Sequence, residues 1–201
     1  MTQATTVQDV REFRTLPKDI GVALVVIVAL ALGLVLRYSL ESRTATYQDK
    51  NFPFSISYPA TWTNVAANKN LLLDVENPRS AGAFKTTLEV DARGLDPSSP
   101  VTLQQLVDRR VQDNSKLTAY HLISTREDTV GGAKANRVEY AYVVQPIDQA
   151  RRASLPVVVH AVNYVVVTKA NVYYITLAAP DEEYTDASAQ FDQIIRTVKV
   201  Q

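Results

Sequence analysis

Few residues of this chain have both the type and the spacing that chemistry requires. The two histidines, His121 and His160, could act as metal ligands or as a general base, because imidazole titrates near neutral pH. No second histidine lies two or four residues from either one, and each falls in a segment with β-strand character. We therefore interpret both as isolated strand residues, and we predict neither a catalytic residue nor a metal site.

The densest acidic cluster is Asp181-Glu182-Glu183, followed by Asp186. Its carboxylates could bind a divalent cation through oxygen ligands. They also adjoin the start of a predicted helix, where negative charge complements the helix dipole. We favour this structural interpretation.

Two arginine pairs are the basic counterpart of this cluster. Arg109-Arg110 falls on the polar side of a predicted helix, and Arg151-Arg152 falls in a predicted loop. Either pair could contact an acidic lipid or a partner protein, but we interpret both as solvated surface. Trp62 could serve as a ligand platform, although its place at the end of a strand favours a role in the core.

Composition excludes several classes of protein. The chain has no cysteine, so it has no disulfide framework, no cysteine-ligated metal and no lipid-bearing cysteine. Its 201 residues have zero formal net charge and a pI of about 6.7, which argues against a nucleic-acid partner. Neither a nucleophile elbow nor a phosphate-binding glycine loop is present. We predict no cofactor, and the sequence identifies no specific small-molecule ligand.

The elements that must position these residues begin with an apolar block. Residues 20–36 contain no polar side chain, and Asp19 and Arg37 flank them. At 1.5 Å per residue this block spans roughly 25 Å, close to the hydrocarbon core of a bilayer. We predict a transmembrane helix over 20–38, anchored by Ile20, Val22, Leu24, Val25, Ile27, Leu30, Leu32, Leu34, Leu36 and Tyr38.

Two other interpretations of the block are possible. A cleaved signal peptide is disfavoured because the block exceeds the usual apolar region of about 7–15 residues and no small-x-small cleavage site follows. A buried helix of a water-soluble protein is disfavoured so close to the N-terminus. Lys and Arg are balanced on the two sides, so charge does not decide the orientation. We expect the usual topology, with a short cytoplasmic tail (residues 1–19) and a periplasmic or extracellular domain.

After a linker (residues 39–46), residues 47–201 are predicted to form one globular domain. Alternating apolar residues indicate strands near 52–58, 71–76, 84–91, 120–126, 138–144, 156–168 and 172–178. Helices are expected over 102–114, capped by Thr102, and over about 186–198. Gly131-Gly132 indicates a tight turn. Short connections favour a largely antiparallel sheet, and the pattern predicts an α+β fold.

The first strand carries a family resemblance. Residues 47–62 end in Tyr58-Pro59-Ala60-Thr61-Trp62, which resembles the Tyr-Pro-x-x-Trp phrase of the PsbP-like domain superfamily. Asn51-Phe52-Pro53 departs from the family's commoner Gly-Phe. The resemblance covers about residues 47–200 and implies an α/β/α sandwich. Its signature core residues here are Phe54, Tyr58, Pro59 and Trp62.

The resemblance also implies a non-enzymatic role, because what the family's members share is binding to a partner. We expect a single-pass, membrane-anchored accessory subunit of a larger membrane protein complex, for energy transduction or photosynthesis. Its partners would be the lipid bilayer, through residues 20–38, and other subunits of that complex. The alternative is a membrane-tethered domain that binds a small molecule or a lipid in an apolar cleft near Trp62.

Overall fold

The computed structural model describes residues 17–41, 43–65, 71–145 and 155–200. The chain divides into two compact units between Ser42 and Arg43. The first unit contains α1 (Pro17–Glu41), a helix of 25 residues. Every residue from 21 to 36 is exposed, although the helix is apolar all round in this stretch. Among the described residues, no helix combines the length and the apolar character needed to cross a membrane. The predicted helix is confirmed, whereas the membrane span stays a prediction.

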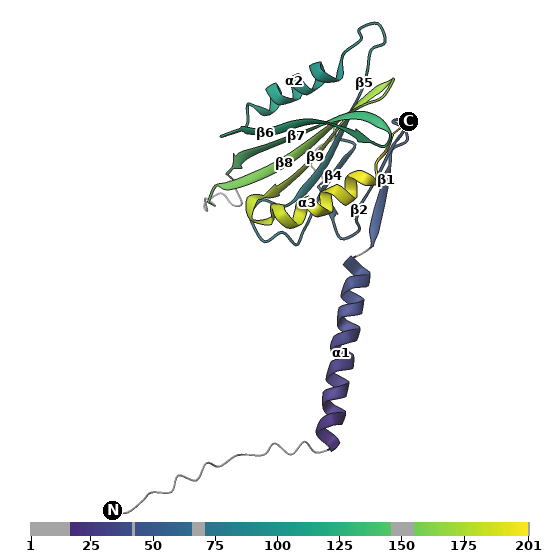
Figure 1. Ribbon diagram of the computed structural model, residues 1–201, viewed down its shortest axis with the longest axis vertical. Helices are drawn as coiled ribbons and strands as arrows, with labels where there is room; N and C mark the ends of the chain where they lie inside the picture. The colour runs from purple at the N-terminus through teal and green to yellow at the C-terminus, as the bar shows by residue number, and fades with distance from the viewer. Residues whose placement is uncertain (1–16, 42, 66–70, 146–154, 201) are drawn as a thin grey trace, which may run out of the picture. The chain divides into compact units, whose positions relative to one another are not determined.

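The second unit is an α+β domain, drawn in Figure 1. Its elements in chain order are β1 (Thr44–Gln48), β2 (Phe54–Pro59), β3 (Thr63–Asn64), β4 (Leu73–Glu76), β5 (Thr87–Gly94), α2 (Leu103–Asn114), β6 (His121–Val130), β7 (Ala133–Val144), β8 (Val157–Val167), β9 (Asn171–Pro180), α3 (Asp181–Arg196) and β10 (Lys199–Val200).

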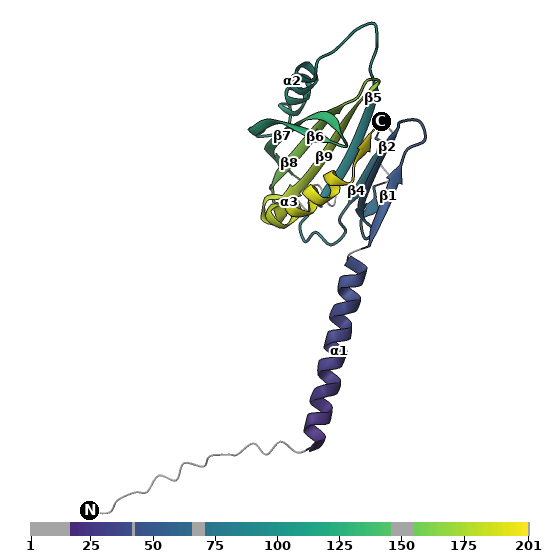
Figure 2. The same cartoon turned by 45° about the vertical axis from the view of Figure 1, so that its right-hand side comes forward.

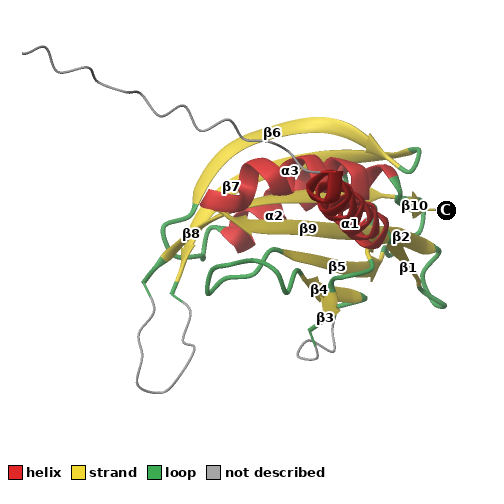
Figure 3. Cartoon of the chain, turned by 90° about the horizontal axis from the view of Figure 1, so that it is seen from below, coloured by secondary structure: helices red, strands yellow, loops and turns green. Residues whose placement is uncertain are grey.

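Two sheets form the domain. Seven strands are ordered β3-β4-β5-β9-β8-β7-β6, and three more are ordered β1-β2-β10. Each of these neighbouring pairs is antiparallel, as the short connections predicted. Figure 3 shows β6 at one outer edge of the large sheet and β3 toward the other.

The two faces of the large sheet carry separate cores. On β9, Tyr173, Ile175 and Leu177 pack into the core beneath α3, together with residues of β2. The alternate residues Val172 and Tyr174 pack into the core beneath α2. This alternation follows from the two-residue period of a strand. Helices α2 and α3 therefore cover opposite faces, as Figures 1 and 2 show, and the expected sandwich is observed.

The β6–β7 hairpin confirms the glycine turn. Gly131 and Gly132 have φ values of 58° and 82°, which L-residues with a Cβ rarely adopt. Thr102 caps α2 in a reciprocal arrangement: its Oγ1 accepts from the Gln105 N–H, and the Gln105 side chain accepts from the Thr102 N–H. Both local features had been expected from residue type alone.

Several predicted boundaries need correction. Helix α3 begins at Asp181 and not near Asp186: Pro180, at the N-cap, has the extended ψ of 144° that is typical of a residue preceding a helix. It ends at Arg196, and the following residues pair with β2 as β10. The predicted linker, 39–46, overlaps both α1 and β1, whose pairing with β2 begins at Thr44. Strand β5 lies about three residues later than expected and ends at Gly94.

Most of the predicted tail, 1–19, lies outside the described residues, as do Arg151 and Arg152 of the predicted loop.

Candidate functional site

An arginine-lined cleft opens on the α2 face of the domain, between α2, the end of β5 and the start of β9. It encloses about 330 Å³. That is near the lower end of the size usual for small-ligand sites. Its lining includes three arginines, Arg93, Arg109 and Arg110, around the ring of Tyr174. Part of the wall is aliphatic, from Leu95, Val101, Leu106 and Val172.

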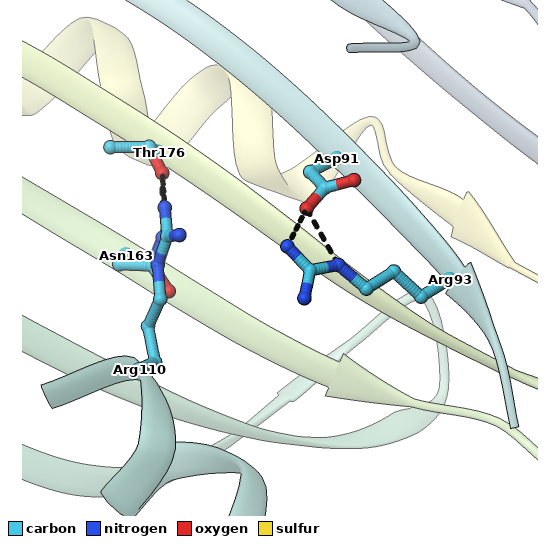
Figure 4. Close-up of polar contacts among 5 residues, drawn as sticks. All are labelled: Asp91, Arg93, Arg110, Asn163 and Thr176. Atoms are coloured by element: carbon cyan, nitrogen blue, oxygen red, sulfur yellow. Dashed lines mark hydrogen bonds and ion pairs between the residues drawn. The ribbon is translucent and has the colours of Figure 1, made fainter. Parts of the chain in front are cut away.

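Arg110 is held at the floor of this cleft by neutral partners. Its Nη2 donates to Oγ1 of Thr176 at 3.1 Å. The fully buried amide of Asn163 lies 2.6 Å from the same Oγ1, and with its oxygen toward Arg110 it accepts from Nε and Nη2 at 3.3 Å each. Figure 4 shows the three side chains converging from α2, β8 and β9. Three elements therefore fix the position of this guanidinium.

The ring of Tyr174 lies against two guanidinium groups. The Cζ atoms of Arg93 and Arg110 are 5.5 and 5.3 Å from its centroid, within the range of a cation–π contact. Arg93 is also bound to Asp91, at 2.9 and 3.1 Å, as Figure 4 shows. Burial raises the pKa of the Tyr174 hydroxyl, although the nearby arginines oppose that rise. Tyr174 therefore stays neutral at physiological pH, and its buried ring supports the two guanidinium groups.

The carboxylates at the rim are occupied by other groups. Asp96 accepts from the hydroxyl and the N–H of Ser98, which lower its pKa. Asp113 is paired with Lys116 at 3.0 Å, and this contact lowers the Asp113 pKa. Neither carboxylate forms a hydrogen bond or ion pair with Arg109 or Arg110 within the described part of the chain.

A buried acid lies next to Arg110 on the same face of the sheet. Glu89 of β5 is the register partner of Thr176. Burial raises the pKa of Glu89, the charge of Asp74 raises it further, and the charge of Arg110 opposes both. Burial also raises the pKa of neighbouring Tyr140 to about 12. This face of the sheet therefore carries an acid, Glu89, as well as the guanidinium groups.

A second polar cluster lies on the α3 face. His160 Nε2 is 3.2 Å from Oδ1 of Asp181, and its ring meets the ring of Tyr184 edge-on at 4.7 Å. The Tyr184 hydroxyl donates to Glu139 at 2.7 Å, and Arg137 pairs with the same carboxylate at 2.6 Å. Burial alone would raise the Glu139 pKa, but the bonds from Tyr184 and Arg137 lower it overall. The cluster ties α3 to β7 and β8.

The other residues considered for chemistry in the sequence are His121 and the acidic cluster that begins at Asp181. His121 is exposed on β6. The acidic cluster forms the first turn of α3, and Glu183 accepts from the Ala81 N–H and from Thr86, joining the helix to the loop before β5. No group of three or more metal-ligating acidic or histidine side chains occurs among the residues described.

The signature residues lie in the core beneath α3 or against it. Phe54 is buried and stacks on Tyr173 at 5.2 Å, Trp62 is buried, and Tyr58 packs against the same core. Pro59, at the end of β2, is also buried. Trp62 therefore fills the core and is not part of the arginine-lined cleft. Arg109-Arg110 lines that cleft: Arg109 is exposed, as predicted, whereas Arg110 is half-buried. Only the tertiary contacts of Arg110 reveal this, because no local motif marks it.

Comparisons with known proteins identify the fold. No family model and no curated protein matches the sequence. Among solved structures, cyanobacterial PsbP (CyanoP) from Synechocystis sp. PCC 6803 matches with a TM-score of 0.57 over 79% of this chain and 92% of that chain, at 15% identity. The domain has a PsbP-like fold.

Two further structures match. LpqN of Mycobacterium tuberculosis, described as involved in cell envelope biogenesis, matches with a TM-score of 0.58 at 11% identity, over 78% of this chain and 90% of that one. The Ran-binding protein Mog1p of Saccharomyces cerevisiae has a TM-score of 0.47 at 15% identity, over 79% and 95%. At these identities the likeness to photosynthetic and envelope proteins shows a shared fold alone.

Proposed function

We propose that this chain is a non-enzymatic, membrane-anchored accessory subunit whose PsbP-like domain binds other components of a membrane protein complex. The observation that carries the proposal is the surface of α1. Its large aliphatic side chains between Val22 and Leu36 are 48–66% exposed. Leaving such a surface in water is unfavourable by about 25 cal/mol per Å² of apolar area. A bilayer covers it without requiring a partner helix.

No described helix meets the length and hydropathy of a span, but the apolar run of α1 comes close to those dimensions. Its uncharged run, residues 20–36, has 17 residues, at the short end of the range of about 17–25 for a span. The helix continues on both sides to 25 residues, or roughly 37 Å at 1.5 Å per residue. Tyr38 can occupy the interface, where tyrosine is favoured. We place the domain on the extracytoplasmic side, as is usual for an uncleaved N-terminal anchor.

The likeness to CyanoP and LpqN supports a binding role near a membrane complex or the cell envelope. By analogy with CyanoP, we favour a complex for energy transduction or photosynthesis. Co-purification from native membranes in a mild detergent tests this. We expect the chain to migrate with a larger assembly. A chain recovered only as a monomer at every detergent concentration would contradict the proposal.

Protease treatment of intact cells or spheroplasts tests the orientation. We expect the domain to be digested while a cytoplasmic marker survives.

The arginine-lined cleft favours a second candidate, a membrane-tethered domain that binds a small molecule. Its aliphatic wall and fixed guanidinium groups could hold a ligand without any protein partner. Native mass spectrometry of the chain released from membranes distinguishes the two. A stoichiometric small ligand without associated subunits would favour the second candidate.

A further inference from the structure

We propose that the arginine-lined cleft binds a carboxylate group, presented by an acidic side chain of a partner protein or by a small organic acid. The inference builds on the proposed binding role, but it does not depend on α1. Loss of carboxylate binding would leave membrane association unchanged, so the two proposals can fail separately.

Arg110 brings a positive charge into the cleft. Burying a guanidinium is costly unless an opposite charge compensates it. Here its hydrogen bonds go to the neutral side chains of Thr176 and Asn163. Glu89 and Asp113 lie within electrostatic reach of this charge, but neither forms an ion pair with it. Among described residues, therefore, the half-buried Arg110 has no ion-pair partner, and an anion in the cleft would supply one.

Arg109 supplies a second guanidinium group, whose donors are free among the described residues, beside Arg110. Arg109 also lines the cleft, and none of its donors has a hydrogen bond or ion pair with a described residue. The rim acids that could have bound it are engaged with Ser98 and Lys116. Arginine presents its donors in a planar fork that matches a carboxylate. Two neighbouring guanidinium groups thus offer donors to one oxyanion.

The remaining lining of the cleft indicates which chemical group would carry the carboxylate. An aliphatic wall from Leu95 and Val172 lies beside the arginines. A carboxylate on a short apolar stem, such as a glutamate side chain, suits this combination. The rim acids Asp96 and Asp113 also repel added negative charge. They oppose a dianionic phosphate more strongly than a monoanion, which favours a carboxylate.

Titration of the full chain in a neutral detergent tests the proposal. The probes are N-acetylglutamate α-amide, a Gly/Ser-rich peptide with one glutamate, the same peptide with glutamine, and inorganic phosphate. We expect the glutamate peptide or the small acid to bind, to weaken as salt is raised, and to bind better than phosphate. Binding of the peptide alone assigns the ligand to a partner protein, and equal binding of both assigns the site to the carboxylate itself.

Variants separate the site from a general charge effect. Arg109→Gln removes an exposed donor that no described contact requires for folding, and it should weaken carboxylate binding about tenfold. Arg110→Gln should weaken binding at least as much, with folding checked by circular dichroism. Arg126→Gln, which removes an exposed arginine on β6, is the matched control and should leave binding unchanged. The proposal is overturned if neither carboxylate binds, if phosphate binds as tightly, or if all three variants behave alike.

Discussion

Gly131 lies directly against Val198: a Cβ placed on Gly131 would come within 2.9 Å of the Val198 carbonyl oxygen. The turn between β6 and β7 is thus packed against the chain that leaves α3. Gly131 satisfies two requirements at once, a positive φ and the absence of a side chain. The neighbouring Gly132 also has a positive φ, but nothing lies within 4 Å of its Cβ position.

The first prediction compares these two glycines. Gly131→Ala should lower the free energy of unfolding by about 3 kcal/mol, because backbone strain adds to displacement of the residues around Val198. Gly132→Ala, which meets only the strain, should cost about 1 kcal/mol. Chemical denaturation of the two variants measures the difference. Equal losses would show that the close contact with Val198 does not matter.

The second prediction concerns the start of α2. Thr102→Ala removes the side-chain oxygen that accepts from the Gln105 N–H, and it should destabilise the protein by about 1 kcal/mol. Amide hydrogen exchange should accelerate in the first turn of α2. Thr102→Ser keeps the oxygen and serves as the control. Unchanged exchange in the alanine variant would rule out a stabilising cap.

The third prediction is a pH dependence that arises from Glu139. Its pKa is lowered in the folded state by the bonds from Tyr184 and Arg137, against a usual value of 4.5. The resulting stability is present above pH 4.5 and is lost as the pH falls through the folded pKa. Glu139→Gln should cost about 2 kcal/mol at neutral pH and flatten the loss of stability in acid.

Tyr184→Phe is the milder comparison for this cluster, because it removes one hydrogen bond and keeps the pair between Glu139 and Arg137. It should cost about 1 kcal/mol. Urea unfolding between pH 3 and pH 7 measures all three proteins. Parallel pH curves for the wild type and Glu139→Gln would exclude Glu139 as the source of the acid sensitivity.

The fourth prediction tests the membrane attachment through α1. Leu30→Arg places a charge in the middle of the uncharged run, where insertion costs about 2.5–3.5 kcal/mol. We expect a larger share of the protein to be extracted by alkaline carbonate. Leu30→Val should stay in the membrane pellet. Identical fractionation of both variants would count against the anchor.

The sequence predicted much of the domain because the signals were local. Alternating residues placed most strands, and Gly131-Gly132 placed a hairpin, because a two-residue period and a positive φ depend on neighbouring residues alone. The Tyr-Pro-x-x-Trp phrase indicated the PsbP-like fold that the solved structures support. The start of α3 was missed because its first turn is acidic and its apolar periodicity begins later.

The candidate site could not be predicted in the same way. Arg110 and Thr176 are 66 residues apart, and Tyr184 and Glu139 are 45 apart. Periodicity indicates which side chains share a face of one strand, but strand order and register decide which strands lie side by side, and a shift of one residue reverses every face. The amino-acid sequence by itself therefore determined the elements and their apolar faces. Only the packing of α2 on the sheet decided that Arg110 would be half-buried against Thr176 and Asn163, and that the arginine pair would line a cleft.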